Sequence, residues 1–289
     1  MTLAAMLRLP LTLRATLPVT VALLVAATSV ARAEVVPAHL VLLNGRAIPL
    51  TAVALQGDNF VVKTAAADFV VGATIPASTV DHVYGDKPAA INQAVALVLT
   101  GKPDAAFDLL EPLLAQHKDT AKLPGNFWFE AARAALVAKA LGSATAAVND
   151  LAKAISDATP AQGIDPISML GKALMLPITT KISDRVDALR ILATAEMPAD
   201  VCAYATYFRA ELLKKDKQDA EALEAYLSVP CLFPTGGMVI NGVAQFKAAE
   251  ILTAMTRREE GLALVNSSLR CVKGTAAEEL SNKLLQSIK

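Results

Sequence analysis

The stretch Ala94-Val-Ala-Leu-Val-Leu-Thr-Gly101-Lys-Pro-Asp-Ala-Ala106 decides the fold, because a glycine separates two apolar helical segments and a small residue follows five positions later. The same spacing returns at Gly142 and Ala147, 41 residues further on. A helix-turn-helix repeat about 34 residues long is typical of stacked helical hairpins. Small residues allow the two helix backbones of one hairpin to approach closely. The pattern therefore predicts a series of helical hairpins.

The rest of the chain from Ala89 onward is also expected to be helical. Its long runs of alanine and leucine are broken by glycine, proline and aspartate. Asp165-Pro166 supplies an N-cap and a first-turn proline for a helix running toward Met175, and Pro177 ends that helix. Later turns are expected at residues 214–219 and 257–260. The sequence therefore predicts about four to five hairpins, with an irregular one in the middle.

The hairpin pattern resembles the tetratricopeptide repeats. A turn at Gly101 places small or apolar residues at five family positions: Ala94, Leu97, Ala106, Leu110 and Leu113. A turn at Gly142 does the same, with Pro160 closing the unit: Ala135, Ala138, Ala147, Leu151 and Ala154. The resemblance implies an α-solenoid over residues 88–289 that binds a protein or peptide partner.

Residues 34–87 are expected to form a small antiparallel β-domain. The short apolar runs predict strands at 39–43, 53–55, 60–62, 69–71 and 80–84, and Asn44-Gly45 predicts a hairpin turn. Their order resembles the small SH3-like or Sm-like β-barrels that precede helical repeats in some exported proteins. The predicted fold class is therefore α+β and mostly α, with a β-meander or barrel before the helices. A sheet of this size should depend on the first helices for stability.

The first 33 residues read as a signal peptide. Arg8 and Arg14 precede an apolar run at 19–27, and Ala31-Arg32-Ala33 supplies small residues at a cleavage site. We therefore expect a mature chain that starts at Glu34, without a membrane span, in the periplasm or cell envelope. A retained anchor is the alternative, although the run at 17–30 is shorter than the roughly 20 residues that a spanning helix needs.

The charge balance gives no reason to expect nucleic acid as a partner. Loss of the three arginines in the signal peptide leaves 24 basic groups against 27 acidic ones, a net charge of about minus 3. A nucleic-acid-binding surface requires an excess of positive charge.

No motif for catalysis, metal binding or cofactor binding stands out. The three histidines, His39, His82 and His117, lack the spacing of a metal site. Asp81 and His82 are neighbours on a strand and are expected to point to opposite faces, which argues against a hydrolase triad with Ser78. Gly236-Gly237 has no following lysine and is expected to be a linker.

Four residues are candidates for partner binding. Trp128 is the only tryptophan, and Tyr204, Tyr207 and Arg209 are expected on a first helix, which faces the inner groove in the repeat family. The alternative for all four is ordinary packing in the core.

We expect the protein, and with it the three cysteines, to reach an oxidising compartment, where thiols tend to form disulfides. Cys202 at the start of one helix and Cys231 at the end of its antiparallel partner are the predicted disulfide. Free thiols are the alternative, and Cys271 has no assigned partner.

These features together predict a non-catalytic protein–protein interaction scaffold of the cell envelope. The first alternative is a chaperone-like or accessory subunit that handles envelope proteins or polysaccharide. An enzyme on a repeat fold is the third possibility.

Overall fold

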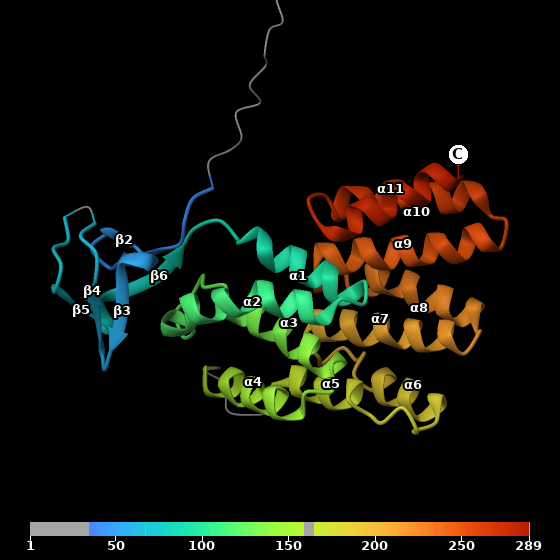
Figure 1. Ribbon diagram of the computed structural model, residues 1–289, viewed down its shortest axis with the longest axis horizontal. Coiled ribbons are helices and arrows are strands. Elements are labelled where there is room, and N and C mark those ends of the chain that lie inside the picture. The colour runs from blue at the N-terminus through green and yellow to red at the C-terminus, as the bar shows by residue number, and fades with distance from the viewer. Residues whose placement is uncertain (1–34, 67, 159–164, 289) are drawn as a thin grey trace, which may run out of the picture. The chain divides into compact units, whose positions relative to one another are not determined.

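The computed structural model describes residues 35–66, 68–158 and 165–288 of the 289-residue chain. Contacts divide the chain into Met1–Glu34 and Val35–Lys289, and the described residues belong to the second unit. The expected signal peptide and Pro160 lie outside the described residues. Within them the fold is α+β and mostly α, with two small antiparallel sheets followed by 11 helices (Figure 1).

Six short strands come first: β1 (His39–Leu42), β2 (Ala47–Pro49), β3 (Val53–Gln56), β4 (Asn59–Val62), β5 (Thr74–Pro76) and β6 (Val80–Tyr84). They form two three-stranded sheets with the orders β2-β1-β6 and β3-β4-β5. Alternate residues of β1 and β4 are buried, namely Leu40, Leu42, Phe60 and Val62. This alternation gives each sheet one core-facing side.

Two details of the β part differ from the expectation. The strand predicted at 69–71 is absent, since Phe69 makes only an isolated bridge to Ala66 and the chain then turns at Gly72, where φ is +85°. The strands β2 and β5 were not predicted, because three residues are too few to show an alternating pattern. In addition, β6 pairs with β1 and not with β5, so the chain does not run as a simple meander.

The β part packs against the segment that joins the first two helical pairs. The backbone N–H of Val83 donates to the carbonyl oxygen of Pro124 (2.9 Å), and that of Leu55 donates to a carboxylate oxygen of Asp119 (2.9 Å). Gly125 has a φ of +76°, and a Cβ there would lie 2.2 Å from the carbonyl oxygen of Val83. Only glycine fits this close approach.

The helices are α1 (Ala89–Leu99), α2 (Pro103–His117), α3 (Trp128–Leu141), α4 (Thr145–Ala158), α5 (Pro166–Leu174), α6 (Ile182–Arg190), α7 (Ala199–Lys215), α8 (Asp219–Leu232), α9 (Met238–Ala254), α10 (Arg258–Cys271) and α11 (Ala276–Ile288). The change from strand to helix falls between Tyr84 and Ala89. Among the residues described, no helix is long and apolar enough to cross a membrane.

Four helical pairs share one turn geometry: α1–α2, α3–α4, α7–α8 and α9–α10. In each turn one residue has a left-handed backbone: Gly101, Ser143, Lys217 and Thr256, with φ of 79°, 56°, 62° and 63°. The N–H of the next residue donates to the carbonyl five positions earlier: Lys102 to Leu97, Ala144 to Lys139, Gln218 to Leu213 and Arg257 to Leu252. This pattern is a Schellman-type helix end, and its recurrence makes the four hairpins structural repeats.

The turns correct the predicted position of the second hairpin. The fifth residue after each left-handed position is buried at the helix crossing: Ala106, Val148, Ala222 and Gly261. The sequence pattern used Gly142 and Ala147, but Gly142 has a φ of −80° and Ala147 is half-buried. The turn therefore lies one residue later than expected. Because Gly142 and Ser143 are both small residues at a helix end, the pattern alone did not distinguish them.

The pair α5–α6 lacks this turn. The Asp165 side chain accepts a hydrogen bond from the backbone N–H of Ile167 (2.9 Å), so it caps α5 as predicted, with Pro166 in the first turn. The helix ends at Leu174, before Pro177, and α6 begins at Ile182. The irregular middle unit expected from the sequence is therefore confirmed.

The first helices of the pairs form a closed ring. Contacts run from α1 to α3, α5, α7 and α9 in turn, and α1 also packs against α9 and α11 (Figure 1). The side-chain oxygen of Gln93 in α1 accepts a hydrogen bond from the N–H of Ala276 (2.7 Å). In an open solenoid each repeat contacts only its neighbours. Here the first helix also meets the last hairpin and α11.

Candidate functional site

One pocket lies where four helices of the ring end. The last residues of α1, α3, α5 and α7 all line it, namely Leu99, Leu141, Leu174 and Lys215. Its volume is about 630 Å³, within the range of roughly 300–1,000 Å³ that is usual for small-molecule sites. The antiparallel pairing explains this convergence, because each first helix ends at the same end of the ring, where the chain turns back into its second helix.

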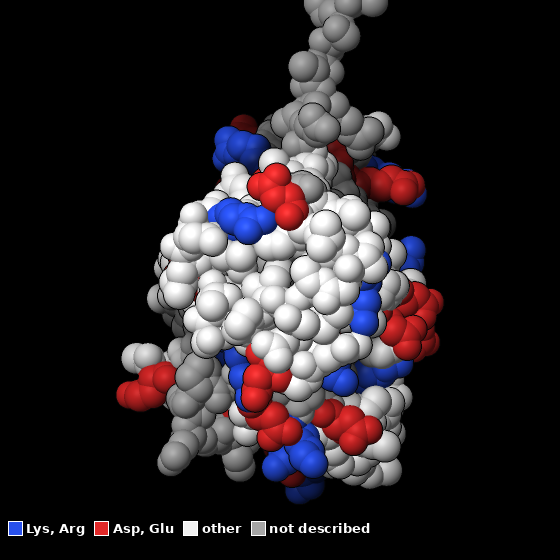
Figure 2. Space-filling model, turned by 90° about the vertical axis from the view of Figure 1, so that its left-hand side faces the viewer, with Lys and Arg blue, Asp and Glu red and all other residues white. Residues whose placement is uncertain are grey.

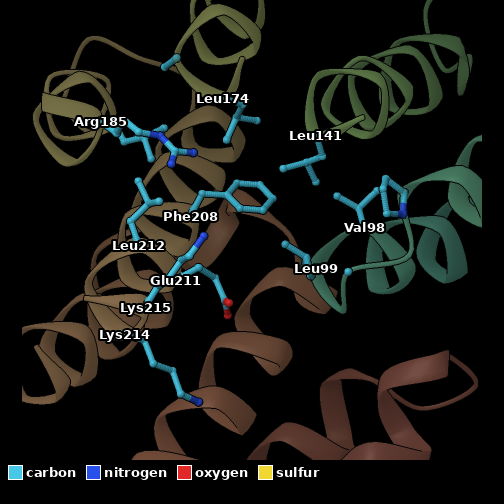
Figure 3. Close-up of a pocket in the computed structure, with 14 residues that line it drawn as sticks. Val98, Leu99, Leu141, Leu174, Arg185, Phe208, Glu211, Leu212, Lys214 and Lys215 are labelled. Atoms are coloured by element: carbon cyan, nitrogen blue, oxygen red, sulfur yellow. The ribbon is translucent and has the colours of Figure 1, made fainter. Parts of the chain in front are cut away.

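The walls of the pocket are apolar (Figure 3). The contributing side chains are Val98, Leu99, Leu141, Leu174, Phe208 and Leu212. Phe208 is only 8% exposed and stacks parallel to Tyr204, with their ring centroids 6.3 Å apart. Packing therefore holds the aromatic wall in place.

Charged side chains lie along one side of the pocket. Arg185 comes from α6, and Glu211, Lys214 and Lys215 come from the last turns of α7. In Figure 3, Arg185 and Lys215 point toward the middle of the pocket, whereas Lys214 points away from it. Lys214 pairs with Glu250 in α9 (3.2 Å), and Glu211 accepts a hydrogen bond from the hydroxyl of Tyr226 (2.5 Å). These two groups are therefore already engaged.

Arg185 and Lys215 differ from their neighbours. Within the described residues, neither side chain makes an ion pair or a hydrogen bond, and the Nε atom of Arg185 is buried without a partner. The carbonyl ends of the surrounding helices carry partial negative charge, which favours cations at this end of the ring. The pocket therefore combines apolar walls with two cations that make no ion pair within the part of the chain that the structure describes.

The opposite end of the ring is closed by ion pairs. Arg133 in α3 contacts Asp200 in α7 (2.7 Å) and both carboxylate oxygens of Asp165 (2.9 and 3.0 Å). Burial alone would lower the pKa of Arg133, but the two carboxylates together raise it. Lys87 pairs with Glu130 beside this cluster (2.7 Å). Each cation here has a carboxylate partner, in contrast to Arg185 and Lys215.

The four residues predicted to bind a partner are mostly in the core. Trp128 and Tyr204 are 5% and 4% exposed, Tyr207 is fully buried, and Arg209 is half-buried. Burial raises the pKa of Tyr204, with Asp200 adding to the effect. The structure therefore buries Trp128, Tyr204 and Tyr207 in the core, which was the alternative to partner binding. The sequence missed Arg185 and Lys215, whose only signal was their position near apolar helix ends.

The predicted disulfide is not formed in this structure, since all three cysteines are free. Cys202 is buried in α7, and its sulfur lies 3.4 Å from the carbonyl oxygen of Thr194 and 3.6 Å from that of Leu192. Cys231 is exposed in the last turn of α8. The side chain of Cys202 thus turns toward the connection between α6 and α7. The register argument placed both cysteines at one end of a hairpin but did not include their side-chain directions.

The expectation for Asp81 and His82 is wrong in one respect. Their side chains do meet, with Nδ1 of His82 2.8 Å from a carboxylate oxygen of Asp81. The register between β1 and β6 shifts at this point, since Val41 faces His82 and Leu42 faces Val80, so Asp81 is the extra residue of a bulge. A bulge disturbs the alternation of side chains, which explains the contact. Both side chains are exposed.

The other predicted features are found as follows. Gly236 and Gly237 lie in the connection between α8 and α9, as expected for a linker. His117 is buried in α2, and its ring meets that of Phe127 edge-on at 6.1 Å. No group of three or more metal-ligating side chains occurs among the residues that the structure describes.

The β part carries an exposed apolar patch formed by two turns. Leu43, Val70 and Val71 are 69%, 70% and 63% exposed, and we call these three residues the turn patch. The two turns are neighbours, because the guanidinium of Arg46 lies 4.1 Å from the ring centroid of Phe69. Figure 2 views the β part, and few charged side chains lie on this face.

The chain was also compared with known proteins. No protein-family model matches it. No curated protein and no solved structure is similar enough to count as a match.

Proposed function

We propose that this protein is a non-catalytic interaction scaffold of the cell envelope that binds another protein through the turn patch. The observation that carries this proposal is the exposure of Leu43, Val70 and Val71 on two neighbouring turns. Exposed apolar side chains that gather on a protein surface are typical of protein–protein contact sites. The turn patch also lies on turns, where the sequence is free to vary without loss of the sheets.

The helical part of the proposal is a set of tetratricopeptide-like hairpins. Four identical turns and a small or apolar residue at each crossing support it. The closed ring departs from an open solenoid, so on this proposal the array presents its outer surfaces and the β part to a partner. The β part, with its two packed three-stranded sheets, is proposed to be SH3-like.

Location in the envelope rests on residues 1–33. Their basic start, apolar run and Ala31-Arg32-Ala33 support export and cleavage before Glu34. Mass spectrometry of the N-terminus of the protein recovered from envelopes tests this. A first residue of Glu34 is expected, and recovery of the intact leader would favour the anchored alternative.

The partner experiment compares captured proteins between variants of the full chain. Val70→Asp combined with Val71→Asp places two charges in the turn patch, while Ile178→Asp changes one equally exposed side chain in the α5–α6 connection. After cross-linking in intact cells, the double variant should lose a partner that the wild type and Ile178→Asp both retain. Equal capture by all three proteins would contradict the proposal.

The alternatives make different predictions. A chaperone-like subunit should suppress aggregation of unfolded envelope proteins or bind polysaccharide, and the turn patch variant would show which surface is used. An enzyme should turn over esters, peptides or glycosides in a broad panel. Turnover that disappears in His82→Ala would favour the enzyme, because His82 and Asp81 form the exposed pair described above.

A further inference from the structure

We propose that the pocket at the ends of α1, α3, α5 and α7 binds a single-chain aliphatic carboxylate, with its chain along the apolar walls and its carboxylate at Arg185 and Lys215. This site is separate from the turn patch and does not depend on the proposed scaffold function. The ligand class follows from three properties of the pocket: its walls, its unpaired charges and its lack of other free polar side chains.

The walls fit a hydrocarbon chain. Leucine and valine side chains from four helices, α1, α3, α5 and α7, line the pocket together with the ring of Phe208. Val98 and Leu99 are 1% and 3% exposed, so they are fixed by the surrounding core and do not collapse into the space. Burying each methylene group of a ligand on such a surface is worth about 0.8 kcal/mol, or roughly a fourfold gain in affinity.

The charges select an anion. Arg185 and Lys215 have no partner among the described residues, whereas Lys214 is paired with Glu250 at 3.2 Å. A guanidinium recognises a carboxylate through two parallel N–H donors. A carboxylate at Arg185 would thus supply the partner that the protein does not.

The other polar features of the pocket argue against cationic ligands, sugars and nucleotides. Glu211 is held by the Tyr226 hydroxyl and lies 3.9 Å from Lys247, so it is not free to receive a cationic ligand. A sugar or nucleotide needs several hydrogen-bonding groups along its length. Those groups are absent from the apolar wall, where leucine, valine and phenylalanine predominate.

Calorimetry with purified protein tests the ligand class. The probes are the straight-chain acids from hexanoate to dodecanoate, together with 1-decanol and decylamine. We expect affinity to rise about fourfold for each added methylene until the chain fills the pocket. Decanoate should bind at least tenfold more tightly than decanol, because the charge-assisted hydrogen bonds are lost in the alcohol. Decylamine should bind more weakly than both.

Two variants test the placement. Arg185→Gln removes the unpaired charge and should weaken decanoate binding at least tenfold without changing the affinity for decanol. Leu212→Glu introduces a carboxylate into the wall and should abolish binding of both. Arg190→Gln is the matched control, because Arg190 lies on the same helix, is exposed and pairs with Asp187 (3.2 Å); its affinities should equal those of the wild type.

Three outcomes of these binding measurements would contradict the carboxylate site. Absence of binding by every acid, equal affinities for decanoate and decanol, or an unchanged affinity for decanoate in Arg185→Gln would each overturn the proposal. Retained partner capture by Leu212→Glu is expected in either case, because the turn patch is unaltered. Failure of one proposal is therefore distinguishable from failure of the other.

Discussion

The hydroxyl of Tyr207 in α7 donates a hydrogen bond to the carbonyl oxygen of Leu99 at the end of α1, 2.6 Å away. The two residues are 108 positions apart in sequence. Tyr207 is fully buried, and burial raises the pKa of its hydroxyl well above its usual range, with Glu211 adding to the effect. The bond therefore connects α1 and α7, which are the first helices of the first and fourth pairs, across the ring. It lies beside the apolar pocket, which Leu99 lines.

Replacement of Tyr207 by phenylalanine should lower the free energy of unfolding by about 1–3 kcal/mol, because the carbonyl of Leu99 is left buried without a donor. Urea denaturation followed by circular dichroism measures this. Tyr84→Phe is the control, since Tyr84 is 58% exposed and its replacement should have no effect. Equal stability of the two variants would show that the bond contributes nothing to ring closure.

Ala106→Leu and Ala147→Leu should differ in stability. Ala106 is fully buried at a helix crossing, so the larger side chain overpacks it and costs about 1–3 kcal/mol. Ala147 is half-buried beside the crossing formed by Val148, so its replacement should stay within about 0.5 kcal/mol of the wild type. Thermal denaturation of both proteins checks the register. Similar destabilisation by both replacements would instead support the register expected from the sequence, in which Ala147 lies at the helix crossing.

The left-handed turn positions predict opposite effects of glycine and alanine. Thr256→Gly should raise the free energy of unfolding by about 0.5–1 kcal/mol, because a β-branched residue is strained at a φ of 63°. Gly101→Ala should lower it by about 1 kcal/mol through backbone strain alone, since no atom lies within 4 Å of the added Cβ.

Gly142→Ala is the control for the turn. Gly142 has a right-handed φ of −80°, and an added Cβ would be 3.6 Å from the carbonyl oxygen of Lys139, an ordinary contact. This variant should therefore be as stable as the wild type or slightly more stable. A loss as large as that in Gly101→Ala would place the left-handed residue at 142.

Stability should fall as the pH drops below about 6.5, the ordinary pKa of histidine. Burial lowers the pKa of His117 in the folded protein, so the folded state stays neutral where the unfolded chain takes up a proton. Protonation of the unfolded chain then favours unfolding, and the stabilisation is lost between the ordinary pKa and the lowered one.

Denaturation at pH 7.5 and pH 5 measures this slope. His117→Leu should reduce the slope, because leucine takes up no proton in either state. The replacement removes no side-chain hydrogen bond from Nδ1, which is buried without a partner. An unchanged slope in His117→Leu would assign the pH dependence to other groups.

The three thiols should react at different rates. Cys231 is exposed and should be alkylated first, whereas burial, together with the charge of Asp200, raises the pKa of Cys202 and slows its reaction. Mass spectrometry of purified protein that was denatured and alkylated without reductant should find three modified cysteines. A peptide pair linked through Cys202 and Cys231 would instead support the disulfide expected from the sequence.

The sequence by itself determined the helical class of the described residues from Ala89 onward, four of the six strands of the β part and the break at Pro177. These features depend on local chemistry: the period of apolar residues, the cap at Asp165 and the turn-forming glycines. The sequence also placed the α1–α2 turn correctly at Gly101, because glycine is the residue that tolerates a left-handed backbone best.

Only the tertiary structure decided the ring, the burial of Tyr204 and Tyr207, and the pocket. Contacts such as Tyr207 with Leu99 join segments far apart in sequence, and no local pattern encodes them. The left-handed turns at Ser143, Lys217 and Thr256 were also decided by packing, since these residue types do not favour that conformation themselves. Arg185 and Lys215 became a candidate site only when four helix ends met, because a charge at a helix end is ordinarily solvated.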